Sequence, residues 1–151
     1  MPDYAFRDLP TLLAGSGPYI APFRAKLDSF SEGLAEHPER VTELELATGA
    51  AVIAVLLEYA CQAQNVVNIE LGRAGLVALP REWLLARIEP ALEPLFAVND
   101  AWEYRRMLEV AELLDAALTR KLIRRGLESE NEEIREAAED WRDALTSDAG
   151  E

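Results

Sequence analysis

The sequence has very few of the residues on which most catalytic and metal sites depend. It contains one histidine and one cysteine among 151 residues. Ser-His-Asp and Cys-His catalytic sites and histidine-based zinc sites all need a histidine with suitable partners. His37 instead precedes Pro38 in a segment that we expect to be a surface loop. Cys61 cannot form an intramolecular disulfide and is expected to be a small buried hydrophobe. We therefore expect no catalytic residue, metal or cofactor.

Long apolar segments and targeting signals are also lacking. The most apolar run, from Ala50 to Leu57, is far shorter than the roughly 20 residues that a transmembrane helix needs. The first residues do not combine a basic stretch with an apolar one, as a secretory signal peptide would. Together with the single cysteine, these absences predict a cytoplasmic protein without a membrane partner.

Positive charge is scarce. The chain has 28 Asp and Glu residues against 15 Lys and Arg residues, which gives a formal net charge of −13. Such a surface repels the phosphates of nucleic acids and of anionic lipids, so neither is expected as a partner. It would attract a basic protein, although an excess of acidic residues also serves solubility alone.

The residues that are abundant indicate one helical domain. Half of the residues are hydrophobic, and the length fits a single domain over residues 1–151. No segment alternates apolar and polar residues convincingly, so the predicted fold class is all-α, a bundle or short stack of about five helices. Proline and glycine predict an irregular arm at 1–21 that carries one short helical turn, and the tail at 147–151 is expected to be frayed.

Two helices are predicted in the first half of the chain. One follows Pro22, keeps apolar residues on one face and ends at His37. The other runs from Thr42 to about Gln64 and starts with a capping box formed by Thr42 and Glu45. It is apolar on nearly every side, which is typical of a central helix. For residues 65–80, a short strand and a loop remain alternatives.

Three further helices are predicted in the second half. The third starts at Pro80 and should kink or break near Glu89, because prolines inside a helix remove a hydrogen bond and clash with the preceding turn. The fourth is capped by Asp100 and ends at Gly126. The fifth is capped by Ser129 or Asn131.

The end of the chain resembles a pair of helices from a HEAT repeat. The segment Leu122-Ile123-Arg124-Arg125-Gly126-Leu127 and the segment Glu130-Asn131-Glu132-Glu133-Ile134-Arg135-Glu136-Ala137-Ala138 are similar to the turn and second-helix opening of such repeats. The resemblance covers about residues 101–146. It implies stacked helices and protein–protein binding, and it names no partner and no catalytic residue.

One candidate ligand site combines aromatic and basic residues. Trp102, Arg105 and Arg106 open the fourth predicted helix, and Trp83 and Arg87 lie on the third. Because Trp102 and Arg106 are four residues apart on a helix, they can form a cation–π contact or an anion pocket. The three arginines would then hold a small acidic ligand. Alternatively, the tryptophans belong to the core and the arginines pair with glutamates of their own helix.

Two acidic features are further candidates. Glu58 lies on an otherwise apolar helix, and burial would raise its pKa and suit it to general acid or base catalysis. Alternatively, it reaches solvent or pairs with an arginine. The segment 128–151 contains ten acidic residues against Arg135 and Arg142. It either docks a basic partner or forms a solvated outer face.

The leading functional hypothesis is a non-catalytic helical interaction or inhibitor-type protein with a strongly acidic surface. Its partner would be a basic protein or a second copy of the chain. The alternative is a small-molecule binding protein or enzyme, with a site between helices built from Glu58 or from Arg87, Arg105 and Arg106. A third possibility is an obligate homodimer with a structural role.

Overall fold

The computed structural model describes residues 6–62 and 64–149, and these contain helices and no β-strand. The predicted all-α fold class is therefore confirmed. The chain divides into two compact units, Met1–Glu93 and Pro94–Glu151, which we call the N-terminal and C-terminal units. A single domain over 1–151 stays a prediction. No helix among the described residues is both long and apolar enough to cross a lipid bilayer.

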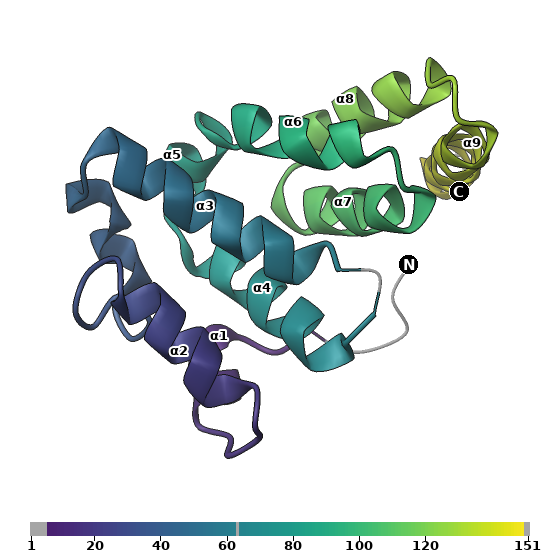
Figure 1. Ribbon diagram of the computed structural model, residues 1–151. Helices are drawn as coiled ribbons and strands as arrows, with labels where there is room; N and C mark the ends of the chain where they lie inside the picture. The colour runs from purple at the N-terminus through teal and green to yellow at the C-terminus, as the bar shows by residue number, and fades with distance from the viewer. Residues whose placement is uncertain (1–5, 63, 150–151) are drawn as a thin grey trace. The chain divides into compact units, whose positions relative to one another are not determined.

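The described residues form nine α-helices and one 3-10 helix, more than the five helices predicted. The N-terminal unit contains α1 (Leu9–Leu13), α2 (Ile20–Asp28), the 3-10 helix η1 (Pro38–Glu43), α3 (Leu46–Ala60), α4 (Val66–Ala78) and α5 (Arg81–Leu85) (Figure 1). The helix α6 (Ile88–Val98) passes from this unit into the C-terminal unit, which contains α7 (Ala101–Leu114), α8 (Ala116–Leu127) and α9 (Glu132–Ala149). The count differs because two predicted helices are each divided, because residues 66–78 form a helix of their own, and because α1 and η1 are counted as well.

The start of the chain forms the short helix expected within the arm, although the arm is shorter than predicted. The Asp8 carboxylate caps α1 by accepting a hydrogen bond from the Thr11 N–H at 3.0 Å, and hydrogen bonds with Thr11 lower the pKa of Asp8. The leucines of α1 are buried, and α1 contacts α2 and α4. The arm ends at residue 19 because α2 already begins at Ile20. Residues 1–5 lie outside the described part.

The first predicted helix ends earlier than its apolar pattern suggests. Here α2 stops at Asp28, and residues 29–36 form turns with Gly33 in the left-handed region at φ 80°. The Asp28 carboxylate accepts a hydrogen bond from the Ala35 N–H at 3.0 Å, which folds the turn back onto α2. Leu34 is still buried, so the apolar spacing reflects the core and not a continuous helix.

The capping box predicted at Thr42 is wrong. Thr42 lies in η1, and its hydroxyl donates to the Glu39 carbonyl oxygen at 3.4 Å. Glu45 occupies the N-cap position of α3 without a side-chain capping bond. The expected burial of this helix on nearly every side is also wrong, because Leu46 remains 77% exposed.

Most of residues 65–80 forms α4 (Val66–Ala78), so both the strand and the loop predicted there are wrong. Asn65 starts the helix from a left-handed conformation at φ 75°, and its side-chain oxygen accepts a hydrogen bond from the Asn68 N–H at 3.2 Å. The helices α3 and α4 pack very closely. A Cβ atom at Gly72 would overlap the backbone nitrogen of Ala60. The glycine that suggested a loop is thus needed for helix packing.

The break predicted near Glu89 is present two residues earlier. The helix α5 ends at Leu85 and α6 begins at Ile88. Pro90 falls in the first turn of α6, where backbone N–H groups have no partner within the helix anyway. Pro94 lies inside α6.

The fourth predicted helix is two helices separated at Asp115. Asp100 caps α7 as predicted, because its carboxylate accepts from the Glu103 N–H at 3.0 Å. Asp115 then adopts an extended conformation and caps α8 by accepting from the Leu118 N–H at 3.0 Å. Gly126 does not terminate α8 but lies in its last turn, where a Cβ would overlap the Tyr104 hydroxyl.

The fifth predicted helix is confirmed as α9. Both alternative capping residues take part: the Asn131 side chain accepts from the Glu133 N–H at 2.9 Å, and the Ser129 hydroxyl accepts from the Asn131 N–H at 3.1 Å. Helix α9 continues to Ala149 and residues 150–151 lie outside the described part, so the fraying expected for residues 147–151 stays a prediction. The helices α7, α8 and α9 contact one another, and α9 runs across the other two (Figure 1). The HEAT-like resemblance stays a prediction.

Candidate functional site

Trp83 and Arg87 form a local pair in the N-terminal unit. The Arg87 guanidinium lies 4.8 Å from the centre of the Trp83 ring and donates a hydrogen bond to the Trp83 carbonyl oxygen at 2.9 Å. The Trp83 ring packs on α3, where a Cβ at Gly49 would approach it to 2.9 Å. The ring thus fills space between helices, and the guanidinium already has two local partners.

Glu58 does not meet the condition that would suit it to acid–base catalysis. Its side chain is exposed on α3, whereas the catalytic hypothesis required it to be buried. The structure agrees with the alternative, in which Glu58 reaches solvent from an otherwise apolar helix. Cys61, which follows α3 as its C-cap residue, is buried as predicted.

The other three predicted site residues lie on α7 in the C-terminal unit. The Arg105 guanidinium is 3.8 Å from a carboxylate oxygen of Asp140, and that of Arg106 is 3.1 Å from Glu109. Trp102 is 60% exposed, so the alternative that placed it in the core is wrong. The arginines belong to a helix whose own carboxylates, or those of α9, already face them. A shared ligand site with Trp83, Arg87 or Glu58 stays a prediction.

The first turn of α7 carries a destabilised carboxylate. Burial raises the pKa of Glu103, and the nearby Asp100 carboxylate raises it further. One of its carboxylate oxygens is buried and accepts no hydrogen bond from the described residues. The ionised form of Glu103 is therefore less stable in the folded chain than in water.

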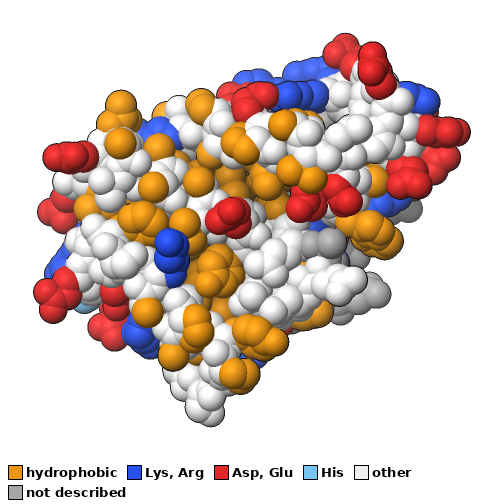
Figure 2. Space-filling model, in the orientation of Figure 1, with side chains coloured by type: hydrophobic (Ala, Val, Ile, Leu, Met, Phe, Trp, Pro, Cys, Tyr) orange, Lys and Arg blue, Asp and Glu red, His pale blue; other side chains and the backbone are white. Residues whose placement is uncertain are grey.

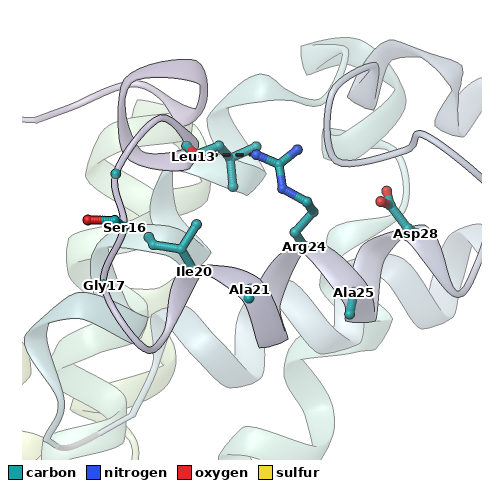
Figure 3. Close-up of a pocket in the computed structure, with 9 residues that line it drawn as sticks. Leu13, Ser16, Gly17, Ile20, Ala21, Arg24, Ala25 and Asp28 are labelled. Atoms are coloured by element: carbon teal, nitrogen blue, oxygen red, sulfur yellow. Dashed lines mark hydrogen bonds between the residues drawn. The ribbon is translucent and has the colours of Figure 1, made fainter.

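A concave region of about 480 Å³ lies beside α2 (Figure 3). Leu13, Ile20 and small residues line it, with Arg24 and Asp28 at its edge. Arg24 donates to the Leu13 carbonyl oxygen at 3.2 Å and pairs with Glu36 at 2.9 Å. None of the six predicted site residues lines this region. Its polar side chains serve the local fold, so its geometry points to no particular ligand.

Titratable groups do not gather into a metal site in the described residues: no group of three or more His, Cys, Asp or Glu side chains is placed to hold an ion. The lone histidine, His37, is exposed as predicted and lies 3.4 Å from the Glu39 carboxylate. Arg73 is buried in α4 with 3% of its surface exposed.

The clearest chemical feature is the outer face of α9. Its carboxylates follow one another at i, i+4, i+7 and i+11, which is one stripe of a helix. These are Glu132, Glu136, Glu139 and Asp143, all exposed. The opposite stripe, which includes Ile134, Ala138 and Trp141, is buried. Figure 2 shows acidic side chains gathered in the region where Figure 1 draws α9. We call these four carboxylates the acidic face.

The sequence left open whether Trp102 is a ligand residue or part of the core, and the structure leaves its indole exposed. The spacing contained the signal, because the buried residues Tyr104, Leu108 and Ala111 form one helical face. Trp102 precedes Tyr104 by two residues, or about 200° around the helix, and so points away from that face.

Comparisons of the chain with protein-family models, with curated proteins and with solved structures gave no match.

Proposed function

We propose that the protein is a non-catalytic helical interaction protein that binds a basic protein through its acidic surface. The observation that carries this proposal is the acidic face of α9. Four exposed carboxylates at helical spacing extend over eleven residues, which is roughly 16 Å along the helix. Lysine and arginine side chains on a partner would neutralise this row of charge.

The acidic face works against the stability of its own helix. Like charges three or four residues apart destabilise a helix by about 0.2–0.5 kcal/mol per pair. Glu136 has four such neighbours, at positions 132, 133, 139 and 140. Solubility alone is served by charge spread over the surface, without a repelling row. A basic partner removes the repulsion, so binding and helix stability favour the same complex.

The alternatives have less support. The acidic-ligand hypothesis relies on Arg87, Arg105 and Arg106, and each of these has a local partner. Self-association would bring together two chains that each carry a net charge of −13. Long-range repulsion opposes that encounter. A basic protein of the cytoplasm is therefore the partner we propose.

The test is affinity capture from a lysate of the source organism at low and high salt, with two matched variants. The first neutralises the acidic face by Glu132→Gln, Glu136→Gln, Glu139→Gln and Asp143→Asn. The second neutralises exposed carboxylates of the N-terminal unit by Glu32→Gln, Glu43→Gln, Glu45→Gln and Glu82→Gln. We expect the wild type and the second variant to retain basic proteins at low salt only, because salt screens exposed charges. Equal retention by the first variant would contradict the proposal.

A further inference from the structure

The exposed ring of Trp102 lies on the side of α7 that faces α9. Trp102 precedes Arg105 by three residues, so both lie on one face of the helix. The guanidinium of Arg105 contacts the Asp140 carboxylate at 3.8 Å. A large aromatic surface and a carboxylate-rich helix therefore share one side of the C-terminal unit.

Three contacts fix where α9 crosses α7. The Asn131 side chain donates to the Asn99 carbonyl oxygen at 2.9 Å, just before each helix begins. Further along both helices come the Arg105–Asp140 contact and then the hydrogen bond from Trp141 Nε1 to the Glu112 carboxylate at 2.6 Å. Trp102 lies between Asn99 and Arg105 in the chain, and the stretch between the partners of those two residues spans residues 131–140.

That stretch carries Glu133 and Glu136. Glu133 and Asp140 lie on the flank of the acidic face that is turned toward α7, because they share the side of the Asp140–Arg105 contact. Both are exposed. An exposed indole and a contact to this carboxylate flank, made by Arg105, thus share one face of α7. Val98, four residues before Trp102, is 58% exposed and adds apolar surface at the same end.

We infer that Trp102, Glu133, Glu136 and the acidic face form a docking surface for a cationic amphipathic helix of a partner protein. This inference rests on the proposed function and specifies its site. Charge complementarity selects lysine or arginine side chains, and the indole accepts both a cation over its face and an aliphatic stem against it. Exposed tryptophans that become buried in an interface are frequent binding hot spots.

The spacing of the carboxylates sets the length of the partner. The acidic face repeats at i, i+4, i+7 and i+11, so a helix with cations at the same spacing can meet it over about three turns. An apolar residue next to this row of cations would cover Trp102. A partner helix with cations but no apolar residue would contact the carboxylates and leave Trp102 uncovered.

The test uses two synthetic helical peptides of about 15 residues with four lysines at this spacing. One carries leucines beside the lysines, and the other has alanines in their place. Binding is followed by fluorescence anisotropy of labelled peptide at low salt. The wild type should bind the leucine peptide more tightly than the alanine peptide. Trp102→Ala should weaken binding of the leucine peptide about tenfold, so that the leucine and alanine peptides bind equally. Glu133→Gln with Glu136→Gln should weaken both peptides several-fold.

Matched controls come from the N-terminal unit. Leu46→Ala removes a more exposed apolar side chain, and Glu43→Gln with Glu45→Gln removes the same charge. Neither should change the affinity for either peptide beyond twofold. Circular dichroism would establish that every variant remains helical.

The outcomes separate the site from the function. If Trp102→Ala leaves both affinities unchanged while the glutamate variants weaken binding, this docking surface is wrong and the electrostatic function survives. If the Trp102 variant and the glutamate variant bind both peptides like the wild type, both proposals are wrong. If the wild type binds neither peptide at low salt, the docking surface is also wrong, and the capture experiment then decides the function separately.

Discussion

At the scale of single residues, the hydroxyl of Tyr104 makes the most consequential contact in the C-terminal unit. Tyr104 is fully buried, and its hydroxyl donates to the Leu122 carbonyl oxygen at 2.8 Å, which ties α7 to α8. Burial raises the pKa of Tyr104 above its ordinary value, so the phenol stays a donor at working pH. Gly126 leaves the space in which this hydroxyl lies.

Tyr104→Phe should therefore lower the free energy of unfolding by about 1 kcal/mol, the usual net value of one buried hydrogen bond. Urea unfolding followed by circular dichroism measures the change. Tyr59→Phe is the matched control, because the Tyr59 ring contacts Phe23 edge-on and its hydroxyl has no hydrogen bond within the described residues. An equal loss in both variants would show that the Tyr104 hydroxyl does not stabilise the fold.

The Tyr104 hydroxyl stabilises the fold, whereas the ionised carboxylate of Glu103 is expected to destabilise it in a pH-dependent way. Its pKa is raised above 4.5 by burial and by Asp100, so folding favours the protonated carboxyl. The free energy of unfolding therefore falls as pH rises through the raised pKa. Below pH 4.5 Glu103 is protonated in both the folded and the unfolded chain, so it does not destabilise the fold there. Glu103→Gln should therefore raise the unfolding midpoint at pH 7, and the difference should shrink toward zero below pH 4.5. A variant that is less stable than the wild type at pH 7 would refute this assignment.

At the scale of elements, the closest packing in the N-terminal unit lies between α3 and α4. Gly72 has no room for a side chain, because a Cβ would overlap the backbone of Ala60. Gly75 is similarly close to Leu56, whose Cδ2 atom would lie 2.6 Å from an added Cβ. Backbone atoms of a packed helix cannot move aside as a flexible side chain can.

Gly72→Ala should destabilise the protein by roughly 3 kcal/mol, the upper range for overpacking in a core, despite the better helix propensity of alanine. Gly17→Ala provides the control, since an added Cβ there meets nothing within 4 Å. That variant should be neutral or slightly more stable, because alanine restricts the unfolded chain. Chemical denaturation of the two variants measures the difference. Similar stabilities would mean that α3 and α4 separate easily.

The predictable elements were those whose ends depend on local chemistry. Asp100 and Asn131 cap their helices by hydrogen bonds within a few residues, and the buried stripe of α9 follows from spacing alone. Helix α4 was missed because the role of Gly72 depends on a residue of another helix. The break at Asp115 was missed because apolar spacing continues across it.

The same distinction holds for the candidate site. The acidic segment could be recognised from composition, and its arrangement as one face follows from helical spacing. The exposure of Trp102 follows from spacing within α7, but its place on the side toward α9 depends on the contacts of Asn99 and Arg105 across the C-terminal unit. No pattern within α7 contains those contacts. The sequence left open whether Glu58 is buried or reaches solvent, because an otherwise apolar helix does not show which of its sides its neighbours cover.

At the scale of the whole molecule, net charge opposes folding. The chain carries a net charge of −13, and the compact state brings these charges closer together than the unfolded state does. Favourable ion pairs act in the other direction, such as Arg7 with Glu70 at 2.6 Å and Arg24 with Glu36 at 2.9 Å. Exposed pairs of this kind contribute little on average, so the net repulsion should dominate.

Added salt should therefore stabilise the protein. Raising ionic strength from 0.01 M to 0.15 M shortens the screening length from about 30 Å to about 8 Å, which removes repulsion across the molecule before it weakens close pairs. The thermal unfolding midpoint should rise between these conditions, as measured by circular dichroism. The variant with the acidic face neutralised should show a smaller rise, because four negative charges have been removed. A midpoint that falls with salt would mean that the ion pairs outweigh the net charge. Repulsion within the acidic face would then be too weak to destabilise α9, and a basic partner would gain nothing by relieving it.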